Sequence, residues 1–362
     1  MPELTVVVPT FNEAGNLASV VGEVERALAG VDWEVLFVDD DSPDGTAQQA
    51  REMAQVDRRV RCLQRVGRRG LASASIEGML ASSAPYIAVM DGDLQHDPAL
   101  LKAMLGTLQG GQADIVVGSR HVAGGGVGEF SAQRQGISRL ATRLSRAVLK
   151  ADLTDPMSGF FMLTRAALMD CLRHGVSAIG YKILVDLFAS APRPLRFVEL
   201  PYTFRQRQAG ESKLDSKVVW DYLMLLADKL VGRFVPVRFL AFSAVGGLGV
   251  VVHLAVLAVA FKGFGEGFVA AQILATVVAM TFNYVVNNSL TYRDRRLRGW
   301  RFVTGWLSFS LACSVGAFAN VGIAAYLFDR QTFWVLSALS GVLVGAVWNY
   351  AVTSVYTWRQ QS

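Results

Sequence analysis

The first half of the chain alternates short apolar runs with amphipathic segments. A β-branched run covers residues 4–8, and further apolar runs follow at 35–38, 86–90 and 114–118. Between the first two runs, one stripe carries apolar residues at helical spacing: Leu17, Val20, Val21, Val24 and Leu28. Asn12 is the predicted cap of this helix, and a second helix is predicted to start at Asp44-Gly45. Strands that alternate with helices predict an α/β domain with a mostly parallel sheet covered on both faces.

The last third of the chain has a different pattern. Four stretches contain no Asp, Glu, Lys or Arg: 239–261, 267–292, 302–328 and 331–358. Each exceeds the roughly 20 residues that a helix needs to cross a bilayer, and together they leave no polar face for water. The predicted organisation is therefore an α/β domain at 1–213, an interfacial amphipathic segment at 214–237, and an all-α membrane domain of four helices at 238–362.

The membrane part repeats itself. Phe282-Asn283-Tyr284 followed by Thr291-Tyr292-Arg293 ends the second stretch, and Trp348-Asn349-Tyr350 followed by Thr357-Trp358-Arg359 ends the fourth. This predicts two helical hairpins of the same orientation, related by an axis along the membrane normal. Asparagines at or near membrane depth either line a lipid head-group path or form interhelical hydrogen bonds. They are Asn283, Asn287, Asn288, Asn320 and Asn349.

Charge is distributed unevenly along the chain. Residues 1–237 carry 26 Lys and Arg against 27 Asp and Glu, whereas residues 238–362 carry 9 against 3. The basic balance thus comes from the apolar tail, which argues against a nucleic-acid partner. Arginines concentrate before the first stretch, between the second and third, and after the fourth. By the positive-inside rule, both termini and the α/β domain are expected on the cytoplasmic side of the cell membrane.

The remaining compositional signals agree with this location. Mean hydropathy is +0.34 and 52% of the residues are apolar, which excludes a disordered protein. Three cysteines without a CxxC pair fit a reducing compartment rather than a disulfide framework. The N-terminus lacks a basic segment followed by an apolar one, so no cleaved signal is expected.

The first acidic motif, Asp91-Gly92-Asp93-Leu94-Gln95, follows a predicted buried strand. Asp91 and Asp93 supply hard oxygen ligands and Gln95 a carbonyl oxygen, a set that suits Mg²⁺ or Mn²⁺ shared with phosphates. The alternative is a capped turn without metal. His96, next to the motif, either faces a phosphate or has a structural role.

The second acidic motif runs from Asp39 to Asp44. Carboxylates in a row repel one another unless a cation or hydroxyl ligands offset the cost, and a nucleoside would supply ribose hydroxyls and a base N–H. Pro9, Phe11 and Glu13, after the first strand, would form the opposite wall. Helix capping by Asp44 is the alternative. The chain has no GxGxxG between a strand and a helix and no Walker A sequence, which argues against a dehydrogenase or a P-loop NTPase.

Taken together, VDDDSPDGT, MDGDLQHDP, GSR, DPMSGFF and GESKL resemble, in order and spacing, the motifs of the family-2 glycosyltransferases. Within that family the likeness is to the polyprenol (dolichol)-phosphate mannose synthases, and the tail resembles the GtrA-like four-helix domain. The resemblance implies a GT-A fold and an inverting, metal-dependent transfer of mannose from GDP-mannose to a polyprenyl phosphate. UDP-glucose is the alternative donor.

The resemblance also implies roles for individual residues. It assigns the metal to Asp91, Asp93 and Gln95, and the nucleotide to Pro9, Phe11, Glu13, Val38 and Asp40. It assigns the acceptor phosphate to Arg120, Arg134 and Ser138, and closure over the donor diphosphate to Arg207, Ser212 and Lys213. Phe11 stands where Tyr is commoner, which favours stacking over a hydroxyl contact. Ala209 replaces a basic residue of some relatives.

The charge of a phosphate acceptor determines which residues can bind it. Its second pKa is near 6, so it is largely dianionic at neutral pH and needs cations rather than a general base. Cations are present at Arg120, Arg134, Arg139, Arg143, Arg146 and Lys150. Residues 134–150 read as a basic amphipathic helix for an anionic membrane surface, or as a solvated basic face on a packed helix. Asp155 is predicted to orient a sugar hydroxyl or an arginine, or to cap a helix.

A function from another class remains as a rival. The hairpin repeat is also what a lipid-linked sugar transporter with a regulatory soluble domain would show. The partners expected for the enzyme are the nucleotide sugar, the polyprenyl phosphate and membrane lipids.

Overall fold

The computed structural model describes residues 1–126, 149, 151–177, 182–205, 216–232, 235–265, 267–330 and 334–359. The chain divides into two compact units, Met1–Leu230 and Val231–Ser362.

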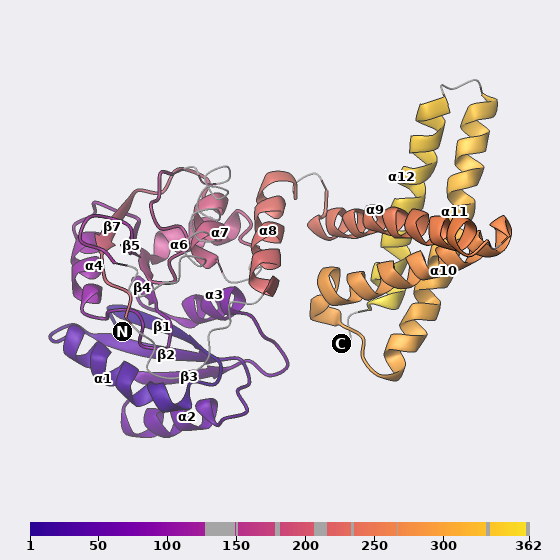
Figure 1. The fold of residues 1–362 in the computed structure, drawn as a ribbon. Helices are drawn as coiled ribbons and strands as arrows, with labels where there is room; N and C mark the ends of the chain where they lie inside the picture. The colour runs from indigo at the N-terminus through magenta and orange to yellow at the C-terminus, as the bar shows by residue number, and fades with distance from the viewer. Residues whose placement is uncertain are drawn as a thin grey trace. The chain divides into compact units, whose positions relative to one another are not determined.

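The first unit is built on one seven-stranded sheet of order β3-β2-β1-β4-β6-β5-β7 (Figure 1). Its strands are β1 Leu4–Thr10, β2 Trp33–Asp39, β3 Val60–Gln64, β4 Tyr86–Val89, β5 Ile115–Ser119, β6 Phe161–Thr164 and β7 Phe197–Pro201. Only β6 runs antiparallel to its neighbours β4 and β5. The prediction of a mostly parallel sheet is therefore confirmed, while β3, β6 and β7 are strands that the apolar pattern did not reveal.

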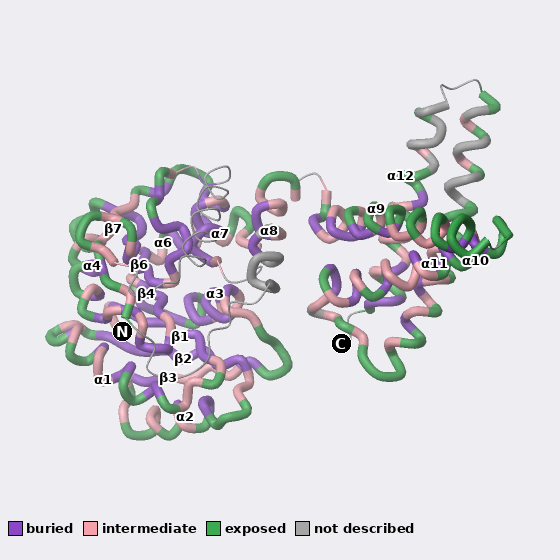
Figure 2. Tube along the Cα trace, viewed as in Figure 1, coloured by how far each residue is buried: buried purple, intermediate pink, exposed green. Residues whose placement is uncertain are grey.

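Helices cover both faces of this sheet. They are α1 Leu17–Ala27, α2 Thr46–Val56, α3 Leu71–Ala81, α4 Leu100–Gln109, α6 Arg165–Arg173, α7 Ile183–Ser190 and α8 Ser216–Val231. Alternate residues of each strand enter opposite layers, as the period of two requires. Val6 and Val8 pack with α1, α2 and α4, whereas Val7 and Val38 pack with α3, α6, α7 and α8. β1 and β2 are buried throughout and purple in Figure 2, whereas β3 is mostly of intermediate burial.

One helix start differs from the predicted one, and the start predicted at Asp44-Gly45 is confirmed. The buried stripe of α1 is the predicted one, but a 3-10 turn at Ala14–Asn16 precedes the helix and Asn16 occupies its N-cap. Asn12 instead has a left-handed backbone, with φ of 60°. At α2, Gly45 is the N-cap, and the Asp44 carboxylate accepts hydrogen bonds from the backbone N–H and hydroxyl of Thr46.

Helix α8 packs against the rest of the first unit. Tyr222, Leu225 and Leu226 are buried in the layer that contains α7. On the same helix, the Lys229 ammonium lies 2.6 Å from the buried carboxylate of Asp186. The interfacial role of 214–237 stays a prediction.

The second unit consists of helices in the four predicted apolar stretches. They are α9 Val237–Ala258, α10 Phe268–Val286, α11 Trp300–Asp329 and α12 Trp334–Val352, with π-helical turns at Val259–Gly263, Asn287–Thr291 and Thr353–Thr357. Two helical segments, Val237–Gly263 and Phe268–Thr291, are long and apolar enough to cross a membrane among the residues described. Large apolar side chains such as Leu254 and Ile273 are exposed on them. The count of four spans stays a prediction.

Aromatic contacts support the predicted repeat. Tyr292 stacks on Trp358 with ring centroids 4.0 Å apart, and Phe242 meets Phe309 edge-on at 6.4 Å. Tyr292 and Trp358 hold the same position in the two halves, at the end of equivalent π-helical turns. Equivalent residues can contact each other only close to the axis that relates the halves, so the axis passes through this aromatic cluster.

Each hairpin also contains one close contact between a glycine and an asparagine. A Cβ on Gly249 would overlap the side-chain amide of Asn283, and a Cβ on Gly316 would overlap that of Asn349. A small residue lets two helices approach at the point where a polar side chain crosses. At the end of α10, the Asn287 side chain donates to the Asn283 carbonyl. The Asn288 side chain bonds the backbone of Leu297. The side chain of Asn320 lies outside the described residues.

Substituting either close-packed glycine should destabilise the membrane domain. Gly316→Ala places a methyl group where the Asn349 amide lies, and overpacking of this kind costs about 1–3 kcal/mol. We expect a lower midpoint of thermal unfolding in detergent, recovered by the double variant Gly316→Ala/Asn349→Ala. Gly246→Ala, with no heavy atom within 4 Å of its added Cβ, is the control. An unchanged midpoint for Gly316→Ala would contradict the contact.

Asp114 fastens the start of β5 to the segment before β7. Its carboxylate is 8% exposed and accepts from Arg193 and from the side chain and backbone of Arg196, each at 3.0 Å. Burial raises the pKa of this carboxyl, but the hydrogen bonds from Arg196 and Arg193 outweigh burial and lower the pKa to about 2.

Asp114 should therefore contribute stability that depends on pH. Because its pKa is lowered in the folded state, the contribution is complete above the ordinary value of about 3.9 and is lost as pH falls through about 2. Asp114→Asn should cost about 1–2 kcal/mol at pH 7, discounted because both arginines are more than half exposed. Unfolding measured between pH 7 and pH 2 should show wild type and variant converging at the acid end. A constant difference would contradict this assignment.

Candidate functional site

The acidic motifs lie on loops that leave the carboxyl ends of neighbouring parallel strands. β1 and β2 end side by side, with Thr10 paired to Asp39, and the Asp40 N–H donates to the Thr10 carbonyl at 3.1 Å. β4 lies on the other side of β1. Among the described residues, three non-glycine residues have a positive φ: Asn12, Asp41 and Leu94. Each lies in one of these loops, and such strain is typical of binding and active sites.

The aspartates after β2 are held by specific donors. Asp39 is fully buried and accepts from the backbone N–H of Ser42 at 2.9 Å and from its hydroxyl at 2.5 Å. The two Asp40 oxygens accept from the Arg65 guanidinium at 2.5 Å and from the Gly70 N–H at 2.6 Å. Burial raises the pKa of Asp40 more than these donors lower it. The Asp40 carboxylate is therefore fixed in place and available to a ligand only through its remaining lone pairs.

The opposite wall comes from the loop after β1. Phe11 carries the Arg69 guanidinium over its ring, 4.4 Å from the centroid. The backbone N–H of Glu13 donates to the Thr46 hydroxyl, and its carboxylate accepts from the Asn16 amide at 2.7 Å. Pro9 and Val38 face each other in the sheet, with the Val38 side chain buried in the core. Any contact of Val38 with a nucleotide must therefore use its backbone.

The Asp91–Gln95 turn packs directly against β1. A Cβ on Gly92 would lie 3.3 Å from Val8 and 3.4 Å from Thr10, so the turn lies tight on the strand end. Asp93 is 6% exposed and accepts from the Gln95 N–H at 3.2 Å, while the Asp91 side chain is 35% exposed. The Gln95 amide nitrogen donates to the Arg205 carbonyl, which leaves its oxygen as the atom for a ligand role.

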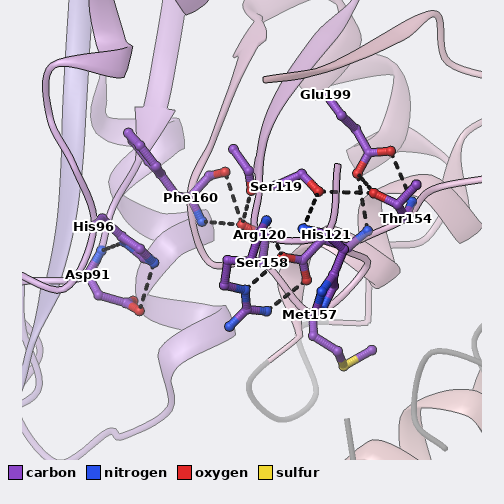
Figure 3. A network of polar contacts seen from close by, with 12 residues as sticks. Asp91, His96, Ser119, Arg120, His121, Thr154, Met157, Ser158, Phe160 and Glu199 are labelled. Atoms are coloured by element: carbon purple, nitrogen blue, oxygen red, sulfur yellow. Dashed lines mark hydrogen bonds and ion pairs between the residues drawn. The ribbon is translucent and has the colours of Figure 1, made fainter. Parts of the chain in front are cut away.

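His96 packs against this turn and holds it by a hydrogen bond. It is buried, stacks on Phe160 at 5.1 Å, and accepts from the Asp91 N–H through Nδ1 (Figure 3). Burial lowers the pKa of His96, which keeps the ring neutral, and its Nε2 lies 3.7 Å from the Asp91 carboxylate. Of the two interpretations of His96, the structure favours the structural one.

The donor set of this turn fits a hard divalent ion that shares its coordination with phosphates. Asp91 and Asp93 supply two carboxylates from one short turn, and Mg²⁺ is commonly bound by one or two carboxylates together with substrate phosphates. Within the described part of the chain, no group of three or more His, Cys, Asp or Glu side chains is arranged to hold a metal. The residues thus fit an ion that arrives with its substrate rather than one in an all-protein cage.

A buried ion pair lies at the carboxyl end of β5. Arg120 forms a two-pronged contact with Asp155, with both N···O distances at 2.7 Å, and its backbone N–H donates to the same carboxylate (Figure 3). Burial opposes both charges, yet mutual hydrogen bonding raises the pKa of Arg120 and lowers that of Asp155. The prediction that Asp155 orients an arginine is confirmed.

The turn that presents Asp155 is itself anchored. Glu199 on β7 accepts from the N–H groups of Thr154 and Asp155 and from the Thr154 hydroxyl. Ser158 donates to the Gly118 carbonyl at 2.7 Å. These contacts, drawn in Figure 3, fix the Arg120 guanidinium by packing and hydrogen bonds before any ligand binds.

Three basic side chains near the site were not predicted from the sequence. Arg65 is 2% exposed beneath Asp40, Arg69 lies over Phe11, and the Lys182 ammonium lies 3.4 Å from the Met157 carbonyl. The basic, glycine-rich segment 65–70 is a signal that could have drawn attention to the first two. Lys182 stands alone before an apolar helix, and its position depends on contacts distant in sequence.

Several predicted residues lie outside the described residues: Arg134, Ser138, Arg207, Ser212 and Lys213, with the basic segment 134–150 apart from Leu149. Arg205 is the last described residue before 206–215. The Arg205 N–H donates to the Gln95 carbonyl, and its guanidinium pairs with Glu23 and Asp97. Arg205 therefore lies beside the Asp91–Gln95 turn.

Comparison with known proteins identifies both parts of the chain. Residues 5–172 match the model of glycosyl transferase family 2, and residues 241–358 match that of the GtrA/DPMS transmembrane domain. A dolichol-phosphate mannosyltransferase of Pyrococcus furiosus is 32% identical over 98% of this chain and 99% of its own. A polyprenol monophosphomannose synthase of Mycolicibacterium smegmatis is 33% identical over 62% of this chain and 85% of its own.

Among solved structures, glucosyl-3-phosphoglycerate synthase from Mycobacterium tuberculosis matches with a TM-score of 0.47 and 18% identity, over 64% of this chain and 80% of its own. The expected architecture, a mostly parallel α/β domain of the GT-A type followed by an all-helical domain, is what the chain shows. The chain belongs to glycosyl transferase family 2 and is a membrane glycosyltransferase that carries a GtrA/DPMS transmembrane domain.

Proposed function

We propose that the protein transfers mannose from GDP-mannose to a polyprenyl (dolichyl) phosphate, with inversion, giving polyprenyl-phosphate-mannose and GDP. The observation that supports this most directly is the pairing of two sites at one sheet edge. The acidic turn Asp91–Gln95 suits a metal-bound diphosphate, and the preorganised Arg120 suits a phosphate acceptor. The relatives named as dolichol-phosphate mannosyltransferases support the choice of sugar and lipid.

The donor nucleotide would bind between the loops that follow β1 and β2. The Asp40 carboxylate would accept a hydrogen bond from a ribose hydroxyl or a base N–H. Phe11 would stack on the base once the Arg69 guanidinium moves off the Phe11 ring or shares that ring with the base. Asp91, Asp93 and Gln95 would hold Mg²⁺ or Mn²⁺, which when bound neutralises charge on the diphosphate leaving group. Arg207 and Lys213 would close over that diphosphate.

The acceptor phosphate would bind at Arg120, with Arg134 and Ser138 as further ligands. Its dianion attacks the anomeric carbon directly, and the bond from that carbon to the diphosphate breaks. The phosphate is already deprotonated at neutral pH, so the protein need not supply a general base. The protein must instead hold two anions together, which an oriented guanidinium does at little reorganisation cost.

The membrane part would place this site near its lipid substrate. The arginine-rich flanks of the apolar stretches support a multi-pass protein whose catalytic domain and both termini are cytoplasmic. The transporter with a regulatory soluble domain is not favoured, because the chain is a family-2 glycosyltransferase over its first unit.

The metal assignment predicts the outcome of a single substitution. Purified wild-type protein with Mg²⁺ or Mn²⁺ should transfer labelled mannose from GDP-mannose to polyprenyl phosphate, and UDP-glucose serves as the competing donor. Asp93→Asn should lower kcat by about 10²–10³-fold or more, because the diphosphate charge is no longer neutralised. Its thermal unfolding should remain close to wild type.

The exposed Asp32, replaced by Asn, is the matched control and should transfer at the wild-type rate. Full activity of Asp93→Asn would remove the metal assignment. Transfer from UDP-glucose but not from GDP-mannose would replace the proposed donor.

The acceptor assignment predicts a different kinetic pattern for Arg120→Lys. A lysine keeps the charge but cannot make the two-pronged contact with Asp155, so the cation is no longer held in place. We expect kcat/KM for the polyprenyl phosphate to fall by roughly tenfold or more, with nucleotide affinity unchanged.

Arg196→Lys is the control, because it breaks a similar fork with Asp114 at the other end of the same strand. It should lower stability without changing the acceptor KM. If both variants behave alike, Arg120 has a structural role only.

A further inference from the structure

Lys182 immediately precedes α7 and reaches the turn that carries Asp155. Its ammonium lies 3.4 Å from the Met157 carbonyl, a long contact and the only hydrogen bond it makes among the described residues. Arg120, Asp91 and Asp155 are the charged groups that act on it. Lys182 is thus a cation at the turn that carries Asp155, and it lies within electrostatic reach of Asp91 and Arg120.

The environment of Lys182 is unfavourable for a positive charge. Burial lowers the pKa of Lys182, and the Arg120 guanidinium lowers it further, while Asp91 and Asp155 only partly compensate. Asp155 is already committed to Arg120 by two contacts of 2.7 Å. Within the described ranges, Lys182 takes part in no ion pair.

A second partly buried lysine shows how this protein stabilises such a charge for structure alone. Lys229 lies 2.6 Å from the Asp186 carboxylate and donates to the Gly175 carbonyl and the Ser190 hydroxyl, both at 2.8 Å. Its charge is neutralised and its donors are used within the fold. Among the described residues, Lys182 has one long hydrogen bond and no ion pair, although a partly buried charge without a close partner is costly.

We propose that Lys182 is a further ligand of the acceptor phosphate, donating from its ammonium to a phosphate oxygen of the polyprenyl phosphate bound beside Arg120. This inference rests on the proposed function. The Arg120–Asp155 pair is electrically neutral, so a dianion placed there needs another cation, and Lys182 supplies one at the same turn. The donor diphosphate is the less suitable anion, because its charge would be offset by the divalent ion that Asp91 and Asp93 would hold.

The test compares three variants of the full-length protein in detergent: Lys182→Met, Lys182→Arg and, as a structural control, Lys229→Met. Affinity for geranyl monophosphate and for GDP with Mn²⁺ is measured by titration, and the KM of each substrate is measured in the transfer assay. Lys182→Met should weaken geranyl monophosphate binding and raise the acceptor KM by about tenfold or more, without changing GDP affinity. Lys182→Arg should recover a large part of the loss.

Two results would overturn the inference. One is unchanged acceptor binding in Lys182→Met. The other is an equal loss of both ligands together with the lowered unfolding midpoint expected for Lys229→Met, which would make Lys182 structural. If wild type transfers no sugar from either donor but Lys182→Met still loses geranyl monophosphate selectively, the proposed function fails and the phosphate ligand stands.

Discussion

The convergence of carboxylates at one edge of a parallel sheet is the constraint on which this structure depends. β1, β2 and β4 end side by side, so Asp39, Asp40, Asp91 and Asp93 are brought together by topology. Repulsion among them must be offset before the fold is stable. Asp39 is offset by the hydroxyl and the backbone N–H of Ser42, and Asp40 by the buried Arg65. The Asp91–Gln95 turn adds two further carboxylates at the same edge, a donor set that suits a divalent cation.

The basic side chains also fall into two groups. The charge of one group is neutralised within the fold, and the other group is oriented at the site for a ligand. Arg65 and Lys229 each have a buried carboxylate partner and further acceptors, so their charge is neutralised within the fold. Arg120 is paired, but its partner fixes the plane of a guanidinium at the site. Orientation of this kind adds little to stability, because a buried pair costs about as much in desolvation as it gains in attraction. Its value is that the geometry exists before the substrate binds.

Much of the architecture follows from local pattern, and the remainder from contacts that no local pattern contains. The apolar runs at 4–8 and 35–38 predict buried strands, and the acidic residues after them predict the site edge, because parallel strands end together. β6, a four-residue strand inserted antiparallel between β4 and β5, has no signal beyond a short apolar run that suits either a strand or a helix. Arg65 could be suspected from its basic, glycine-rich segment. Lys182 could not, since its position depends on a turn 25 residues earlier in the chain.

The aromatic cluster of the second unit explains how two similar hairpins become one domain. Tyr284 packs on Phe309 and Trp358, while Tyr350 packs on Phe242, so each half places its tyrosine on the other half's phenylalanine. Such reciprocal contacts are the signature of a two-fold relation. The symmetry is broken at Asn288, whose amide accepts from the Trp358 indole and from Leu297, whereas the second half has Ser354 at that position. The segment that links the first hairpin to the second has no counterpart in the repeat. Asn288 holds this segment close to the axis, because it bonds both Leu297 in the segment and Trp358.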